Sequence, residues 1–169
     1  KVYYYQRNNN KTGILSSKPF IVVSRSSDEL LKRLAADQHP ILFEGIHTCL
    51  YLSHPSLSYK KRFVRTHNIE HEYYNGLAQA ESDPLKVLYF QSESRKLKRF
   101  EKNLSHATGI LTISKNDELH FSQVNSNICT VSAFHPSEKI NIRHGLGSFA
   151  LYHGSLDVSE NNRAALYLV

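Results

Sequence analysis

The sequence predicts an α/β fold, with a Rossmann-like, mostly parallel sheet and helices on both faces. Short apolar runs without polar alternation recur along the chain, which is typical of strands buried on both faces. Helix-length segments lie between several of these runs and repeat their apolar residues at helical spacing. With 169 residues, 40% of them hydrophobic and 21% charged, the chain is long and apolar enough for one compact core.

The first 40 residues have the weakest pattern. A strand at residues 20–23 is neither favoured nor excluded. A helix is predicted from about Asp28 to Asp37, because Ser27 or Asp28 is a suitable N-cap and leucines follow at helical spacing.

Beyond Pro40 the pattern becomes regular. Five apolar runs predict strands at residues 41–44, 62–66, 109–113, 128–133 and 148–152. A helix of about 20 residues is predicted to begin at Pro84, after a cap at Ser82 or Asp83. Its apolar residues fall close to one face: Leu85, Leu88, Tyr89, Leu97, Phe100 and Leu104.

Composition narrows the classes of function. The chain has 21 Lys and Arg against 15 Asp and Glu, a formal charge of +6 that favours anionic partners. It has no apolar run long enough to span a membrane, and no export signal. Cys49 and Cys129 each lie in an apolar run, which predicts two buried, reduced thiols and a cytoplasmic location. No nucleic-acid-binding motif and no Gly-rich phosphate loop is present, so neither nucleic-acid binding nor a self-contained nucleotide-using enzyme is expected.

Polar residues follow each predicted strand. Ligands of parallel sheets bind at the carboxyl ends of the strands, so these residues are the candidate site. They are Glu44, Gly45, His67, Asn68, Glu70, Ser114, Asp117, His135, His153 and Gly154.

His67, Glu70 and His71 form an HxxEH string, the inverted zinc-protease signature. That motif must lie wholly within a helix, whereas here the strand predicted at 62–66 runs straight into His67. The two imidazoles are therefore predicted to diverge, although zinc hydrolysis stays open as an alternative. At a strand end, His67 can instead bind a substrate hydroxyl or phosphate, oriented by Arg65 or Glu70. A third interpretation makes His67 a hydrogen-bonded residue at the edge of the core.

A basic stretch runs from Arg95 to Lys102 within the long predicted helix. Such a stretch is usually a solvated face, with attraction to an anionic membrane as the second interpretation. A basic Rossmann-like binding module is therefore a further alternative to an enzyme.

Four segments resemble the retaining glycosyltransferases of family 4, in their bacterial, mannosyltransferase-like branch. These segments are FEG at 43–45, FVRTHNIEHEYYNGLA at 63–78, KRFEKNLSHATGILTISKNDELHF at 98–121 and FALYHGSLDVSENNRAALYLV at 149–169. The similarity covers roughly residues 40–169, and the RTHN and ILTIS segments are its most specific parts. The first strand of that family, with its Gly-containing loop, is not recognisable here.

The resemblance implies one half of a two-domain GT-B enzyme. Residues 1–147 would form the acceptor-side Rossmann-like domain, and residues 148–169 would begin the donor domain. The partners would be a nucleotide-sugar donor and a saccharide or lipid-linked acceptor in cell-surface polysaccharide or glycolipid synthesis, with no metal and no further cofactor. The protein would be cytoplasmic or peripheral at the inner membrane.

The resemblance also assigns site residues. Glu44, Gly45, His67, Asn68 and Ser114 would line the acceptor side of the cleft, and His67 would face the transferred sugar. Gly154 would contact the donor phosphate, although Ser155 follows it where many relatives have Arg. This segment alone, without a complete donor domain, is expected to be inactive.

Overall fold

The computed structural model describes residues 1–134, 139, 145, 147–149 and 151–168. Its centre is a parallel four-stranded sheet whose spatial order, β1-β2-β3-β4, is also the order of the strands along the chain. The strands are β1 (Ile41–Glu44), β2 (Arg62–Arg65), β3 (Gly109–Thr112) and β4 (Ile128–Thr130). This arrangement confirms the predicted α/β class and its Rossmann-like parallel sheet.

Helices connect successive strands and flank the sheet. The α-helices are α1 (Phe20–Val23), α2 (Asp28–Leu34), α3 (Glu70–Ala80), α4 (Pro84–Phe100), α5 (Lys115–Phe121) and α6 (Ser159–Leu168). The 3₁₀-helices are η1 (Lys11–Leu15), η2 (Ile46–Tyr51), η3 (Pro55–Leu57) and η4 (Glu101–His106). Residues 20–23, left open by the sequence, are therefore helical.

The predicted caps form as expected. Asp83 accepts hydrogen bonds from the backbone N–H groups of Leu85 and Lys86 and so begins α4, with Pro84 in the first helical position. Ser27 caps α2 by accepting from the N–H of Leu30. These two N-termini are set by local chemistry, which explains why the sequence located them well.

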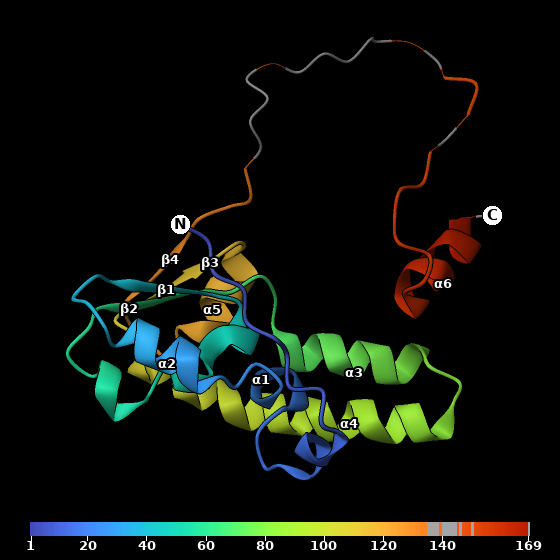
Figure 1. Cartoon of the computed structure of the whole chain (residues 1–169). Coiled ribbons are helices and arrows are strands. Elements are labelled where there is room, and N and C mark those ends of the chain that lie inside the picture. The colour runs from blue at the N-terminus through green and yellow to red at the C-terminus, as the bar shows by residue number, and fades with distance from the viewer. Residues whose placement is uncertain (135–138, 140–144, 146, 150, 169) are drawn as a thin grey trace.

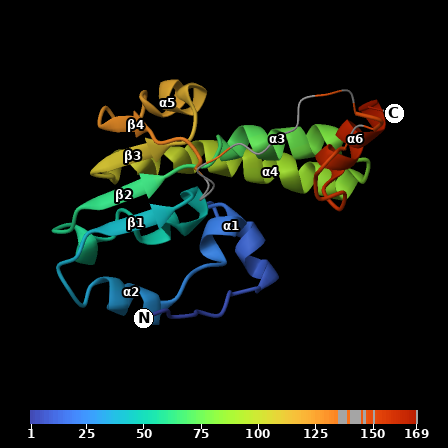
Figure 2. The same cartoon turned by 90° about the horizontal axis from the view of Figure 1, so that it is seen from above.

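The connecting helices lie on one face of the sheet, below it in Figure 1. Seen from above, α3 and most of α4 extend beyond one end of the strands, and α5 lies beside β4 (Figure 2). Right-handed crossovers between successive neighbours place each connection on the same side, because the sheet grows in one direction only. The sequence predicted helices on both faces. On the opposite face of the described sheet, Leu42 is 55% exposed.

One continuous core fills the space between the sheet and these helices. Its buried members are Ile41, Phe43, Ile46, Cys49, Leu52, Leu57, Val64, Ile69, Leu97, Leu104, Ala107, Ile110 and Phe121. Leu85 and Leu88, predicted on the same face of the long helix, are exposed. They lie in the part of α4 that packs beside α3, beyond the end of the sheet (Figure 1).

Two predictions are wrong: the strand at 148–152 and the burial of Cys129. Residues 148, 149, 151 and 152 are exposed and form no strand, because no described strand lies beside them to supply backbone partners; residue 150 lies outside the described residues. Cys49 is buried, and burial raises the pKa of its thiol to about 12. Cys129 is exposed on the edge strand β4, because only one face of that strand is covered.

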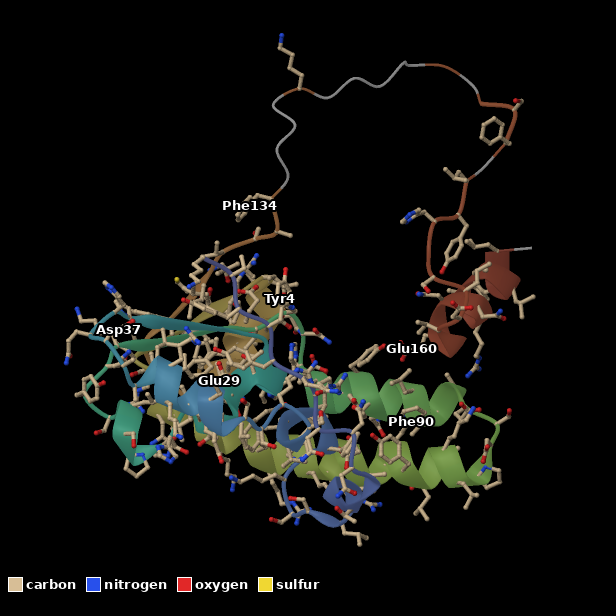
Figure 3. All side chains as sticks on the ribbon, in the orientation of Figure 1. Tyr4, Glu29, Asp37, Phe90, Phe134 and Glu160 are labelled. Carbon is tan, nitrogen blue, oxygen red and sulfur yellow. The ribbon has the colours of Figure 1, made fainter. Side chains whose placement is uncertain are left out.

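The last helix, α6, packs against α3. Arg163 donates from Nη1 to the carbonyl of Gln79 at 3.2 Å. Figure 3 labels Glu160 on the side of α6 that faces α3, and a Cβ on Gly76 would lie 2.6 Å from the Oε1 atom of Glu160. The absence of a side chain at Gly76 therefore permits this close approach.

Candidate functional site

Glu44, Arg65 and His67 meet where β1 and β2 end, and we call this group the edge cluster. Glu44 and Arg65 are paired in register on neighbouring parallel strands. Oε1 of Glu44 accepts from Nη1 of Arg65 at 3.1 Å and lies 2.7 Å from Nε2 of His67. The structure therefore joins three of the predicted site residues at the predicted edge of the sheet.

The edge cluster is open to solvent. The side chains of Glu44 and His67 are 45% and 42% exposed, so His67 is not a core residue. The hydrogen bonds from His67 and from Arg65 lower the pKa of Glu44, and burial opposes them. In the neutral tautomer that donates from Nε2 to an ionised Glu44, Nδ1 of His67 is the acceptor, and no hydrogen bond to it is formed by the described residues.

Gly45 fixes the turn that follows β1. Its φ is +82°, a conformation that favours glycine, and a Cβ there would lie 2.4 Å from Cε1 of His47. The glycine thus lets the chain turn so that the His47 ring packs against the backbone beside Glu44. This is a backbone role, and the binding role of Gly45 stays a prediction.

Three cationic or basic groups near the edge cluster were missed by the sequence analysis: Arg7, Arg25 and His47. Burial lowers the pKa of His47, and the charges of Arg25, His67 and Arg7 lower it further. Burial and the neighbouring Arg7 lower the pKa of Arg25. The only sequence signal for Arg7 was a basic and aromatic start of the chain.

Residues 3–7 form part of the lining of a pocket. Arg7 and Arg25 line it together with tyrosines, and the full lining is Tyr3, Tyr4, Tyr5, Gln6, Arg7, Arg25, Leu30, Thr48 and Tyr51. The hydroxyl of Tyr5 is buried without a partner in the described structure. Positive charge and aromatic rings make this pocket suited to an anionic ligand with a flat part.

The other predicted residues have different environments. Asn68 is half-buried in the turn between β2 and α3, and Glu70 is the first residue of α3. Burial raises the pKa of Glu70, while His67 lowers it. The hydroxyl of Ser114 caps α5 by accepting from the N–H of Asp117 at 3.1 Å, so it has a structural partner. Gly154 lies beside Tyr152 in the exposed segment before α6, as does His153. His135 lies outside the described residues.

The two imidazoles of the HxxEH string diverge, as predicted. Helix α3 begins only at Glu70, so His67 lies before the helix. Nε2 of His67 lies 2.7 Å from Glu44, whereas Nδ1 of His71 lies 2.6 Å from Oε1 of Glu101. The two imidazoles thus bind different carboxylates on different elements.

A second His–carboxylate group surrounds Glu101, and we call it the interhelical cluster. Oε1 of Glu101 pairs with His71, and Oε2 lies 3.2 Å from Nε2 of His120. The three residues come from α3, η4 and α5. No sequence motif links Glu101 or His120 to His71, so the sequence analysis missed both.

The basic stretch of α4 is only partly a solvated face. Arg95, Lys98, Arg99 and Lys102 are exposed, but Lys96 is buried. Nζ of Lys96 binds Glu93 at 2.8 Å and the carbonyl of Ile14 at 2.6 Å. Among the described helices none is both long enough and apolar enough to span a bilayer.

Comparison of the chain with protein-family models, with curated proteins and with solved structures found no match.

Proposed function

We propose that this chain is the acceptor-side domain of a retaining family 4 glycosyltransferase, which transfers a sugar from a nucleotide-sugar to a saccharide or lipid-linked acceptor. The observation that carries the proposal is the edge cluster. Glu44, Arg65 and His67 converge, open to solvent, at the carboxyl edge of a parallel sheet, where Rossmann-like domains bind their ligands. The resemblance described above supports two of these residues, Glu44 and His67.

In this proposal His67 holds a hydroxyl of the sugar that is transferred. Its Nε2–H donates to Glu44, which fixes the tautomer and the ring orientation and leaves Nδ1 to accept. Arg65 donates to the same oxygen of Glu44 and so helps to hold the carboxylate in place. The edge cluster thus positions a substrate hydroxyl and excludes misoriented sugars, which is the part of catalysis that comes from proximity and orientation.

The basic groups beside the edge cluster support a phosphorylated substrate. Arg7 and Arg25 line the neighbouring pocket, and the charges of both arginines, of His67 and of Glu44 influence the pKa of His47. Retaining transfer releases a nucleoside diphosphate, and cationic groups stabilise such a leaving group. Together these residues favour an anionic sugar nucleotide or a diphosphate-linked acceptor over a neutral sugar alone.

The test is a His67→Ala substitution in the full-length protein. Transfer of a radiolabelled hexose from a panel of nucleotide-sugars to an isolated lipid fraction should fall roughly tenfold to a hundredfold, as expected for a lost contact of about 1.4 to 2.8 kcal/mol. The melting temperature should stay nearly unchanged, since His67 is 42% exposed. His39→Ala, at another exposed histidine, is the matched control and should retain full transfer.

Two results would contradict this role. Near-normal transfer by a stable His67→Ala protein would remove His67 from the site. A fall in transfer that only follows the loss of folded protein would make His67 a structural residue.

A further inference from the structure

The interhelical cluster joins three potential metal ligands from separate parts of the chain. His71 lies in the first turn of α3, Glu101 begins η4 and His120 lies in the last turn of α5. One nitrogen from each histidine and a carboxylate oxygen all lie within 4.8 Å of one another. We propose that these three residues bind one divalent transition-metal ion of the zinc class.

Burial makes this cluster different from an ordinary surface ion pair. The side chains of His71, Glu101 and His120 are 12%, 5% and 27% exposed. A carboxylate is almost never buried unless it is paired or coordinates a metal, because losing its hydration is costly. Glu101 has only imidazoles beside its two oxygens, and no Arg or Lys is paired with it in the described structure.

The donor set also matches the chemistry of zinc. Two imidazole nitrogens and one carboxylate oxygen are ligands that zinc binds at about 2.0 to 2.2 Å, with water in an open fourth position. Ligand atoms around such a tetrahedral ion are separated by about 3.3 Å. Nδ1 of His71 lies 2.6 Å from Oε1 of Glu101, and Nε2 of His120 lies 3.2 Å from Oε2, so the two imidazoles approach different oxygens of one carboxylate and small side-chain shifts would bring all three groups onto one ion.

The partly exposed ring of His120 gives the ion a way in. His120 is the most exposed of the three ligands, so water can reach the open position on its side. The two rings lie close together, with centroids 5.4 Å apart. Small side-chain movements would therefore bring both rings to the same ion.

A bound ion would join the start of α3 to the end of α5 through η4. The two histidines lie far from Glu101 along the chain, His71 by 30 positions and His120 by 19. Metal binding is linked to folding when the ligands come from distant segments, because the unfolded chain does not hold them together. Metal binding at this site would thus stabilise the packing of these elements, and it does not depend on the proposed glycosyltransferase activity.

The test is metal binding by the full chain, purified without a histidine tag and stripped with chelator. Dialysis against zinc, followed by elemental analysis, should give one equivalent per chain. Cobalt in place of zinc should give the visible d–d bands of a four-coordinate site with nitrogen and oxygen ligands. The added metal should also raise the melting temperature, since it binds only the folded state.

Two variants and one control isolate the site. His120→Ala should weaken zinc binding at least tenfold while leaving the circular dichroism spectrum unchanged, because that ring is the most exposed of the three. Glu101→Gln keeps the shape and a hydrogen-bonding oxygen but loses the charged ligand, and it should also lose the cobalt bands. His39→Ala, an exposed histidine far from this cluster in sequence, should bind metal like the unaltered chain.

Three outcomes would overturn the proposal. The first is a folded, unaltered chain that takes up no zinc at micromolar concentration; the cluster would then be a hydrogen-bonded triad that shares protons. The second is equal binding by the unaltered chain, His120→Ala and Glu101→Gln, which would place the metal elsewhere. The third is loss of binding in His39→Ala.

Discussion

The edge cluster and the interhelical cluster have the same design, with a glutamate held by two basic side chains. Glu44 lies between Arg65 and His67, and Glu101 lies between two histidines. Their exposures differ, at 45% for Glu44 and 5% for Glu101. Exposed pairs contribute little to stability because water and salt screen them, whereas buried partners cannot be removed without leaving unsatisfied groups. Burial therefore separates a group available to a ligand from one that holds helices together.

The largest effect is expected for Glu101→Ala. In the presence of EDTA, this change leaves both imidazoles of the interhelical cluster without their acceptor and should lower the free energy of unfolding by about 3 kcal/mol. Urea titration followed by circular dichroism measures it. A loss smaller than that of Glu44→Ala would contradict the comparison between the two clusters.

A smaller effect is expected for Gly45→Ala, which tests how the edge cluster is built. The residue has φ +82° and ψ 150°, and a Cβ would meet the His47 ring. Strain of this kind costs about 1 to 3 kcal/mol. Gly13→Ala offers a control at a glycine with ordinary φ. The nearest atom to a Cβ added there would be Cδ2 of Phe20, at 3.2 Å. Equal stability of the two variants would mean that the turn after β1 relaxes freely.

The pH dependence of stability tests the surroundings of the edge cluster, where His47 lies. Burial and the charges of Arg25, His67 and Arg7 lower the pKa of His47 in the folded state, while Glu44 opposes them. The unfolded chain therefore binds more protons below pH 6.5, and stability falls as the pH decreases from there. His47→Gln should reduce this loss between pH 6.5 and 5, measured as melting temperature. A profile identical to that of the unaltered chain would exclude His47 as its source.

The smallest effect is expected for Glu44→Ala. The exposed pairs with Arg65 and His67 contribute at most about 1 kcal/mol to stability. The hydrogen bonds lower the pKa of Glu44, so this contribution is present above pH 4.5 and is lost as the pH falls through the lowered pKa. Thermal melts of Glu44→Ala at pH 7 and pH 3 measure both points; a large loss at pH 7 would place Glu44 in the fold rather than at the site.

Local chemistry explains why the sequence predicted β1, β2 and β3 well. Apolar runs located β1, β2 and β3 within about a residue, because each is bounded by turn or polar residues. The edge cluster followed from the parallel sheet, since the ends of neighbouring parallel strands must meet. The run at 148–152 was equally apolar, but a strand also needs a partner, and periodicity alone does not show one.

The interhelical cluster was beyond sequence analysis for a different reason. His71 and Glu101 are brought together by the antiparallel packing of α3 and α4, and His120 by the position of α5 beneath the sheet. Three helices must be placed in space before these side chains meet. The HxxEH string contains His71 but neither Glu101 nor His120, and His67 precedes α3, as predicted.

The agreement between strand order and chain order has a consequence for how the protein folds during synthesis. Each of β2, β3 and β4 pairs with the strand made just before it, so no strand has to be inserted between two that are already paired. As the chain leaves the ribosome, every new strand meets a preformed neighbour with free backbone groups. The sheet can therefore grow by successive addition at one edge, and each added crossover closes a loop only between adjacent segments, which keeps the entropic barrier to each step low.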